Sequence, residues 1–197
     1  MSAAGPKLSA GALEGRPFHR DDWPLILALH RAPLAARWLL PPGDEASPAR
    51  ARRVAAAFAE DWAAEGFGPY RWRRGGRAIG YGGLARRVIE GAPEIELLIA
   101  LTPESWGQGA ASAIGCAALE ADGPRRSDGS GAHAVGGASV LARIRPDNVA
   151  AERLALRLGF EAAGESGWRG LALAHWRWRP GGAIGGGTGG VMGGNTP

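Results

Sequence analysis

The residues from Trp106 to Ala111 have the types and spacing of a phosphate-binding turn. They follow an apolar segment, residues 94–101, that is expected to be a strand, and they lead into an expected helix over residues 107–121. The first backbone N–H groups of a helix lack intrahelical partners, and with the helix dipole they attract an anion. Gly107 and Gly109 carry no side chain, so a ligand can approach the main chain closely. The sequence therefore predicts a phosphate site formed by Trp106, Gly107, Gln108, Gly109, Ala110 and Ala111.

Two glutamates in the strand before this turn are candidates for acid–base chemistry. Glu96 lies among apolar residues, and burial would raise the pKa of its carboxyl toward the range of a general base. Glu94, two residues earlier, lies on the same face of the strand and is the rival candidate. The alternative for either glutamate is an ion pair with an arginine at a strand edge. The four histidines and the single cysteine, Cys116, form no cluster with metal-ligand spacing, so no metal is expected.

Patterns typical of strands and helices alternate around these residues. Helices are expected from near Pro24, over residues 48–65 with Ser47 as the N-cap, and from Asp147 or Asn148 as the N-cap to Gly159. Five tryptophans, Trp38 among them, fit the periodicity of core faces and are expected to pack in the core. This order predicts an α/β (α+β) fold, a mixed sheet with helices on both faces. The expected strands are residues 13–18, 70–74, 77–85, 94–101, 138–145, 160–165 and 171–178.

Length and composition favour one domain, because 197 residues with 45% hydrophobic side chains are enough to bury a core. No apolar run approaches the roughly 18 residues of a spanning helix and no signal core is present, so we expect a cytoplasmic protein without membrane contact. The net charge is +4, but the arginines are dispersed, so direct nucleic-acid binding is not expected. Residues 1–12 and the glycine-rich tail, 180–197, are expected to be disordered, and residues 123–137 to form a surface loop, which leaves 13–179 as the domain.

Three short motifs occur in order along the chain. They are EGRPF at residues 14–18, WGQGAA at residues 106–111, and RPDNVAAERLALRLGF at residues 145–160. Together they resemble the GNAT superfamily of acyl-CoA-dependent N-acetyltransferases, most closely its ribosomal-protein N-terminal acetyltransferase subgroup. Each motif is weak alone, but their order and spacing over residues 13–178 make the combination specific.

The resemblance implies both a fold and a ligand. The fold would be a mixed, mostly antiparallel central sheet with a splayed parallel strand pair and helices on both faces. The ligand would be acetyl-CoA, a co-substrate whose diphosphate lies on the turn and whose pantetheine arm lies between strands 94–101 and 138–145. Ile99, Ala100 and Leu101 would then contact the coenzyme, with a backbone N–H near Ile99 or Ala100 as the oxyanion donor. Asn148 would contact the pantetheine arm, although it also fits a plain helix cap.

The second substrate implied by the resemblance is a primary amine that attacks the thioester directly. Deprotonating an α-amino group at pH 7 costs about 1 kcal/mol, against about 4.6 kcal/mol for a lysine side chain. A site with few residues for acid–base catalysis should therefore favour the less basic amine. A ribosomal protein, a free small amine and an aminoglycoside-like antibiotic all remain open as acceptors. We expect a bacterial enzyme that is a monomer or a homodimer.

Two positions depart from the family pattern. Many members have a tyrosine general acid seven residues after the motif asparagine, where this chain has Ala155, and the subgroup's serine is replaced by Ala151. A thiol that leaves as the thiolate at pH 7 adds roughly 2 kcal/mol, so the reaction is slowed but not forbidden. The substitutions leave open a catalytically weak or inactive acyl-CoA-binding sensor or scaffold. A different nucleotide-binding protein is disfavoured, because the turn has neither a Gly-Lys-Ser/Thr ending nor GxGxxG spacing.

Overall fold

The computed structural model describes residues 6–122 and 139–179. Expected disorder at residues 1–5 and 180–197, and the expected loop over 123–137, lie outside the described residues. The helices are α1 (Trp23–Arg31), α2 (Pro33–Leu39), α3 (Pro48–Glu65), α4 (Ala110–Asp122) and α5 (Val149–Arg157), with short 3-10 turns η1 (Arg20–Asp22) and η2 (Pro103–Ser105). The strands are β1 (Leu8–Ala10), β2 (Leu13–Pro17), β3 (Tyr70–Arg74), β4 (Arg77–Ile89), β5 (Ala92–Leu101), β6 (Val140–Ile144), β7 (Glu161–Trp168) and β8 (Leu171–Trp178).

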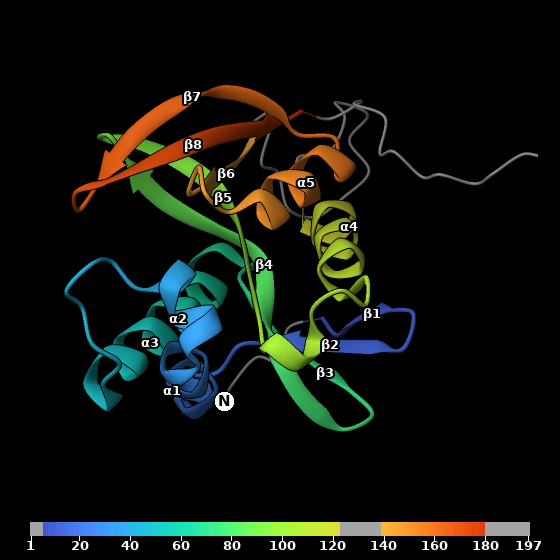
Figure 1. The fold of residues 1–197 in the computed structure, drawn as a ribbon. Coiled ribbons are helices and arrows are strands. Elements are labelled where there is room, and N and C mark those ends of the chain that lie inside the picture. The colour runs from blue at the N-terminus through green and yellow to red at the C-terminus, as the bar shows by residue number, and fades with distance from the viewer. Residues whose placement is uncertain (1–5, 123–138, 180–197) are drawn as a thin grey trace, which may run out of the picture.

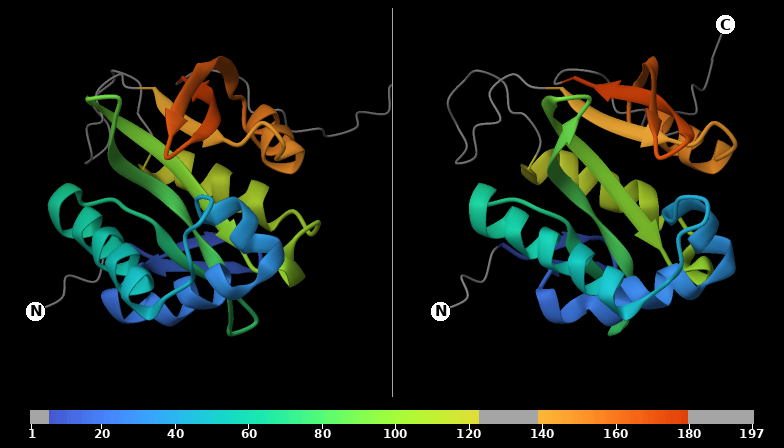
Figure 2. Two further views of the ribbon diagram at one scale, coloured as in Figure 1. Left: turned by 60° about the vertical axis from the view of Figure 1, so that its left-hand side comes forward. Right: turned by 90° about the vertical axis from the view of Figure 1, so that its left-hand side faces the viewer.

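The strands form one sheet in the order β1-β2-β3-β4-β5-β6-β8-β7 (Figure 1). Neighbouring strands are antiparallel except β5 and β6, which are parallel. This parallel pair has only two partner positions in the described chain, Ile95 with Val140 and Glu96 with Leu141. Beyond Glu96 the two strands diverge toward their carboxyl ends, as Figure 2 shows from two further sides. The expected fold, a mostly antiparallel sheet with a splayed parallel pair, is therefore confirmed.

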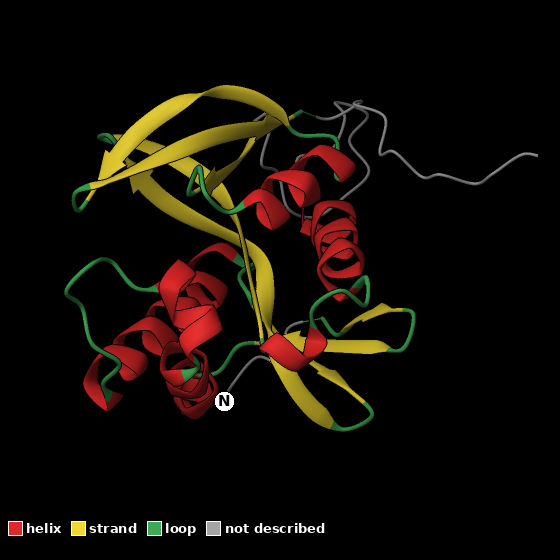
Figure 3. Ribbon diagram, viewed as in Figure 1, coloured by secondary structure: helices red, strands yellow, loops and turns green. Residues whose placement is uncertain are grey.

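The helices lie in two groups on opposite sides of the sheet (Figure 3). One core joins α1, α2 and α3 to the sheet through Ile26, Leu29 and Phe58, together with Tyr81 of β4 and Ala100 of β5. A second core, on the side of α4 and α5, is formed by Ile95, Leu119, Val140, Ala142, Ile144, Ala155, Leu158, Phe160 and Trp178. Each group of helices buries an apolar stripe against one face of the sheet, which is how two helical layers stabilise one sheet.

The alternation of side chains along β5 determines which of them contact the helices on each side of the sheet. Successive side chains of a strand point to opposite faces. Ile95 belongs to the core on the α4 and α5 side, whereas Leu98 and Ala100 pack with α1–α3. Glu94 and Glu96 have the same parity as Leu98, so both point to the α1–α3 side, as expected for two residues on one face.

The structure differs from the sequence-based expectation in several places. Strands β4 and β7 extend to Ile89 and Trp168, beyond the expected ends at residues 85 and 165. Within the N-terminal segment expected to be disordered, residues 8–10 form β1, which pairs antiparallel with β2 and moves the ordered boundary toward the N-terminus. The chain between residues 24 and 47 contains a second short helix, α2, which begins at Pro33. The helix expected from residue 107 begins at Ala110, because Gly107 and Gly109 adopt the left-handed conformation, with φ of 72° and 73°.

The N-terminus of α3 provides a direct test of helix capping. The Ser47 hydroxyl accepts a hydrogen bond from the Arg50 backbone N–H at 3.2 Å, and Pro48 occupies the first turn. We expect Ser47→Ala to lower the free energy of unfolding by about 1 kcal/mol, because that N–H loses its partner. Thermal unfolding should show a melting temperature roughly 2–4 °C lower, with Ser47→Asp close to wild type. An unchanged melting temperature in Ser47→Ala would contradict the role of the cap.

Candidate active site

The turn between η2 and α4 forms a concave backbone surface that lacks side chains. A Cβ atom placed on Gly107 or Gly109 would meet no atom within 4 Å, so open space lies in front of both residues. Their positive φ values turn the main chain so that α4 begins with its first N–H groups unoccupied by a preceding helical turn. The geometry that the sequence predicted for an anion site is therefore present at this turn.

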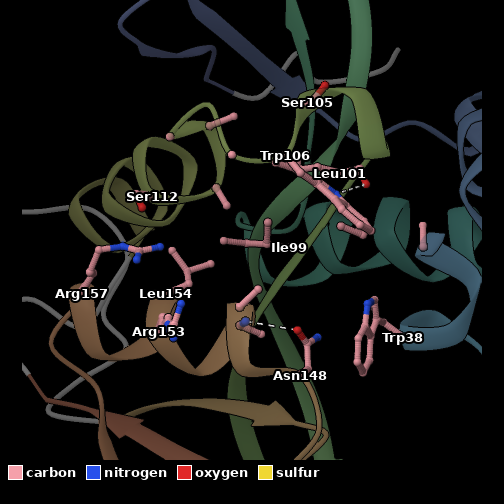
Figure 4. A pocket seen from close by; sticks show the side chains of 18 of the residues that line it. Trp38, Ile99, Leu101, Ser105, Trp106, Ser112, Asn148, Arg153, Leu154 and Arg157 are labelled. Carbon is pink, nitrogen blue, oxygen red and sulfur yellow. Dashed lines mark hydrogen bonds between the residues drawn. The ribbon is translucent and has the colours of Figure 1, made fainter.

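A cavity of about 590 Å³ extends from this turn along the end of β5 to α5. Figure 4 shows the side chains around it, with Trp106 and Leu101 at the turn and Asn148 at the start of α5. The charged side chains among the described lining residues are two arginines of α5, Arg153 and Arg157, and no carboxylate is among them. An anionic ligand is therefore favoured by both the helix terminus and the side-chain charge. The sequence motifs do not single out these two lining arginines, although their spacing of four residues places both on one face of a helix.

Two residues of the predicted turn, Trp106 and Gln108, hold its shape through side-chain hydrogen bonds. The Trp106 indole Nε1 donates a hydrogen bond to the Leu101 carbonyl at 2.9 Å, so the ring is anchored to the end of β5. Gln108 donates to the Glu104 carbonyl at 2.7 Å and accepts from Arg74, which ties the turn to the β3–β4 hairpin. Gln108 is not among the lining residues, whereas Trp106, Gly107, Gly109, Ala110 and Ala111 are. The role of these residues in binding a coenzyme stays a prediction.

The splay of β5 from β6 leaves the end of β5 without a neighbouring strand on the cavity side, although the Leu101 carbonyl accepts from the Trp106 indole. Ile99, Ala100 and Leu101 line the cavity beyond the last β5–β6 partner position. An extended arm can bond to such an edge as an additional strand does. Asn148 lines the same cavity, and its side-chain oxygen accepts a hydrogen bond from the Ala151 N–H at 3.2 Å (Figure 4). The helix-cap role of Asn148 is therefore present, and the position of its side chain is compatible with the predicted ligand contact.

A second cavity, of about 340 Å³, passes through the gap between the splayed strands. Its lining includes alternate residues of β5, Glu96 and Leu98 from one face and Leu97 and Ile99 from the other. It shares six residues with the first cavity, so the two adjoin at the splay. The shared residues are Trp38, Leu39, Ile99, Asn148, Ala151 and Leu154. Trp38 was expected in the core, but it lines both cavities.

Glu96 is buried in this second cavity and is bonded to an arginine of β6. Arg143 donates from Nε to one carboxylate oxygen at 2.8 Å and from its terminal nitrogen to the other at 3.2 Å. Glu94 is similarly bonded to Arg177 of β8, and this guanidinium holds the pKa of the Glu94 carboxyl below its ordinary value, against the opposing effect of burial. The ion-pair alternative is thus present for both glutamates. A catalytic role for Glu96 stays a prediction, and it requires that the carboxylate accept a proton while Arg143 remains beside it.

Tyr81 of β4 lines the same cavity and was missed by the sequence analysis. Burial raises the pKa of its hydroxyl to about 12, the charge of Glu96 adds to the rise, and Arg87 opposes it. The hydroxyl therefore keeps its proton at neutral pH. Its ring packs edge-on against Phe58, with centroids 5.0 Å apart. None of the three family motifs includes Tyr81. It lies at the cavity because the register of β4 against β5 places it opposite Ala100.

The described residues contain no group of three or more histidine, cysteine, aspartate or glutamate side chains arranged to hold a metal ion. Among the same residues, no helix is long and apolar enough to cross a membrane.

The structure thus combines a splayed parallel strand pair with a glycine turn that opens a helix. The family model described as an acetyltransferase (GNAT) domain matches residues 13–161, so the chain belongs to the GNAT acetyltransferase family and is an acetyltransferase. No curated protein matches the chain significantly.

Solved structures share the fold at low sequence identity. A GnaT-family acetyltransferase from Bordetella pertussis aligns with a TM-score of 0.66 and 21% identity, over 87% of this chain and 98% of that one. RimL, a ribosomal L7/L12 α-N-protein acetyltransferase, aligns with a TM-score of 0.66 and 18% identity, over 88% of this chain and 94% of that one. AAC(6')-Ib in complex with ribostamycin and coenzyme A aligns with a TM-score of 0.61 and 18% identity, over 86% and 94%.

Proposed function

We propose that the protein transfers the acetyl group of acetyl-CoA to a primary amine by direct attack in a ternary complex. The observation that carries this proposal is the first cavity, which joins the Gly107–Gly109 turn to the bare edge of β5. It combines a helix N-terminus, two arginines and an unpaired strand edge, which suit the diphosphate and the extended arm of one coenzyme. Structures of relatives named as complexes with acetyl-CoA or coenzyme A share this fold.

In the proposed reaction the amine nitrogen attacks the thioester carbonyl carbon at the junction of the two cavities. The developing oxyanion would accept a hydrogen bond from a backbone N–H near Ile99 or Ala100. Collapse breaks the carbon–sulfur bond and releases coenzyme A as the thiolate, which then takes a proton. The proton lost by the amine would pass to Glu96, directly or through water.

The reaction is tested by release of free thiol when acetyl-CoA is mixed with a panel of amines. We expect thiol release that depends on both substrates, and a saturating heat of binding for coenzyme A alone. The absence of thiol release with every amine would contradict the proposed transfer, and the additional absence of a binding heat would contradict the coenzyme site. A catalytically inactive sensor or scaffold is the second candidate, favoured by Ala151, Ala155 and the paired state of Glu96. It predicts the heat of binding without any turnover.

We expect an N-terminal α-amine to be acetylated faster than a lysine side chain. The fraction of deprotonated amine at pH 7 favours the α-amine by over two orders of magnitude, and the greater nucleophilicity of lysine returns part of this difference. A preference in kcat/KM of roughly tenfold is expected. Two matched peptides, one with only its N-terminus free and one with only a lysine free, measure it. Faster modification of the lysine peptide would contradict the preference.

A further inference from the structure

The second cavity has two halves that differ in chemistry, and the half on the α1–α3 side has room for the acceptor. The strand register determines which residues of β5, β6 and β8 share a face. Glu96 is opposite Leu141, and Arg143 is opposite His175. Alternation then places Leu98, Arg143 and Leu173 on the same side as Glu96. The first cavity, in which the coenzyme is proposed to bind, is lined mainly by the glycine turn, α4 and α5, with Ala35, Trp38 and Leu39 of α2 at one wall. The acceptor amine would then approach through the part of the second cavity that the first does not share, beside Glu96, Arg143 and Leu173.

The walls of this acceptor half are mainly aromatic and aliphatic. Trp168, the last residue of β7, remains 36% exposed, so a broad apolar ring is available at the mouth. Trp38 lies under the guanidinium groups of Arg37, at 4.1 Å, and Arg145, at 5.6 Å, which hold its ring in place. The apolar lining residues of this half include Trp38, Tyr81, Leu98, Trp168, Leu171 and Leu173.

The charges of the acceptor half oppose a cationic ligand. Glu96 is the carboxylate among the described lining residues, and both of its oxygens are engaged by Arg143. The lining also contains Arg145, so arginines outnumber carboxylates. A second ammonium group on the acceptor would meet no free carboxylate among these lining residues, because Arg143 and Arg145 are already paired with Glu96 and Asp147. It would therefore lose hydration without gaining an ion pair.

Two acidic residues near the mouth, Asp44 and Asp147, are paired as well. Asp44, in the loop between α2 and α3, is bonded to Arg50 at 2.5 Å and to Arg169 of the β7–β8 turn at 3.0 Å. Asp147 lies 3.4 Å from Arg145. The β7–β8 turn and the α2–α3 loop thus meet through an ion pair, beside which Trp168 exposes part of its ring next to the Arg169 guanidinium, 5.9 Å from the ring centroid.

From this arrangement we propose that the acceptor is a monoamine on an apolar body, such as the α-amine of an apolar amino acid or peptide, and not a polycation. The inference rests on the proposed function and specifies its second substrate. The volume of about 340 Å³ is at the low end for ligand cavities, in keeping with a small apolar group beside the acetyl carbon. Relatives with this fold include one named as a complex with the aminoglycoside ribostamycin, so the inference separates this chain from that acceptor class.

The test compares acceptors that present the same α-amine on different side chains. The full-length protein is given saturating acetyl-CoA with phenylalaninamide, leucinamide, argininamide or kanamycin, and free thiol is measured. We expect kcat/KM for phenylalaninamide and leucinamide to exceed that for argininamide at least tenfold, with kanamycin lower still. A preference for argininamide or kanamycin, or equal rates, would overturn the acceptor class but leave the transfer reaction standing. No thiol release with any of the four would overturn the transfer itself.

A variant that introduces a negative charge tests the acceptor half directly. Leu171 lines the cavity and is only partly buried, so Leu171→Glu adds a free carboxylate without emptying a core. We expect it to raise the ratio of argininamide to phenylalaninamide turnover about tenfold. Trp168→Glu, at an exposed position of the same mouth, should move the ratio in the same direction and guards against a folding defect in the first variant. Leu156→Glu is the matched control on the exposed face of α5, at 58% exposure, and should leave the ratio unchanged. An unchanged ratio in both mouth variants would overturn the proposal.

Discussion

Gly109→Glu is expected to weaken the binding of coenzyme A by about 100-fold, which corresponds to about 2.7 kcal/mol. Gly109 has φ of 73°, and open space lies where its Cβ would be, so the new side chain would project from the turn at the start of α4. There it adds a negative charge where the helix dipole and the arginines of α5 favour a phosphate, and it fills the space that the diphosphate needs. Isothermal titration calorimetry with coenzyme A measures the change.

Strain from a side chain at positive φ must be separated from the loss of the site. Gly91, in the β4–β5 turn, has φ of 82° and equally open surroundings, so Gly91→Glu carries the same charge and the same strain at the other end of β5. We expect Gly91→Glu to lower stability by about 1 kcal/mol and to leave coenzyme binding unchanged. Coenzyme affinity in Gly109→Glu equal to that of Gly91→Glu would show that the turn does not bind the diphosphate.

Local signals in the sequence were sufficient to locate the glycine turn and to limit the cap of α5 to Asp147 or Asn148, but not to give the first residue of α4. Gly107, Gly109 and Asn148 act through the backbone within a few residues, so their geometry follows from short-range rules of capping and glycine conformation. Helix α3 began and ended as expected for the same reason, with Ser47 at one end and Gly66, φ of 72°, at the other.

The contacts that decide the chemistry of the site are long-range and were not visible in the sequence. Arg143 is 47 residues from Glu96 in the sequence. The two side chains meet because β6 lies parallel to β5 and pairs with it at two positions in the described chain. The periodicity around Trp38 predicts a core residue, but periodicity cannot distinguish a core wall from a cavity wall. Tyr81 enters the site only through the antiparallel register of β4 against β5, which no local pattern specifies.

Glu96→Gln is expected to lower kcat by about 100-fold, if Glu96 is the general base of the proposed reaction. The same change breaks a buried ion pair and leaves the guanidinium of Arg143, 18% exposed, without its carboxylate. A loss of about 3 kcal/mol in the free energy of unfolding is expected from that alone. A lower rate in the single variant therefore does not by itself distinguish a base from a structural partner.

The double variant Glu96→Gln, Arg143→Gln makes this distinction. Two neutral amides can hydrogen-bond across β5 and β6, so most of the lost stability should return. If Glu96 is the base, kcat stays about 100-fold low in the double variant, and Arg143→Gln alone keeps most of its activity. If Glu96 only holds the strands together, kcat recovers along with the melting temperature.

The rival pair on the same face supplies the matched control. Glu94 is bonded to Arg177 at 2.6 Å, and both side chains are more exposed than Glu96, at 19% and 28%. Glu94→Gln therefore removes a carboxylate of the same strand, facing the same side, from the same kind of pair. Because Glu94 is not among the lining residues of the second cavity, we expect lower stability with kcat unchanged. A loss of kcat in Glu94→Gln that equals the loss in Glu96→Gln would assign both effects to the sheet, since only Glu96 lies in the gap through which the amine must reach the thioester.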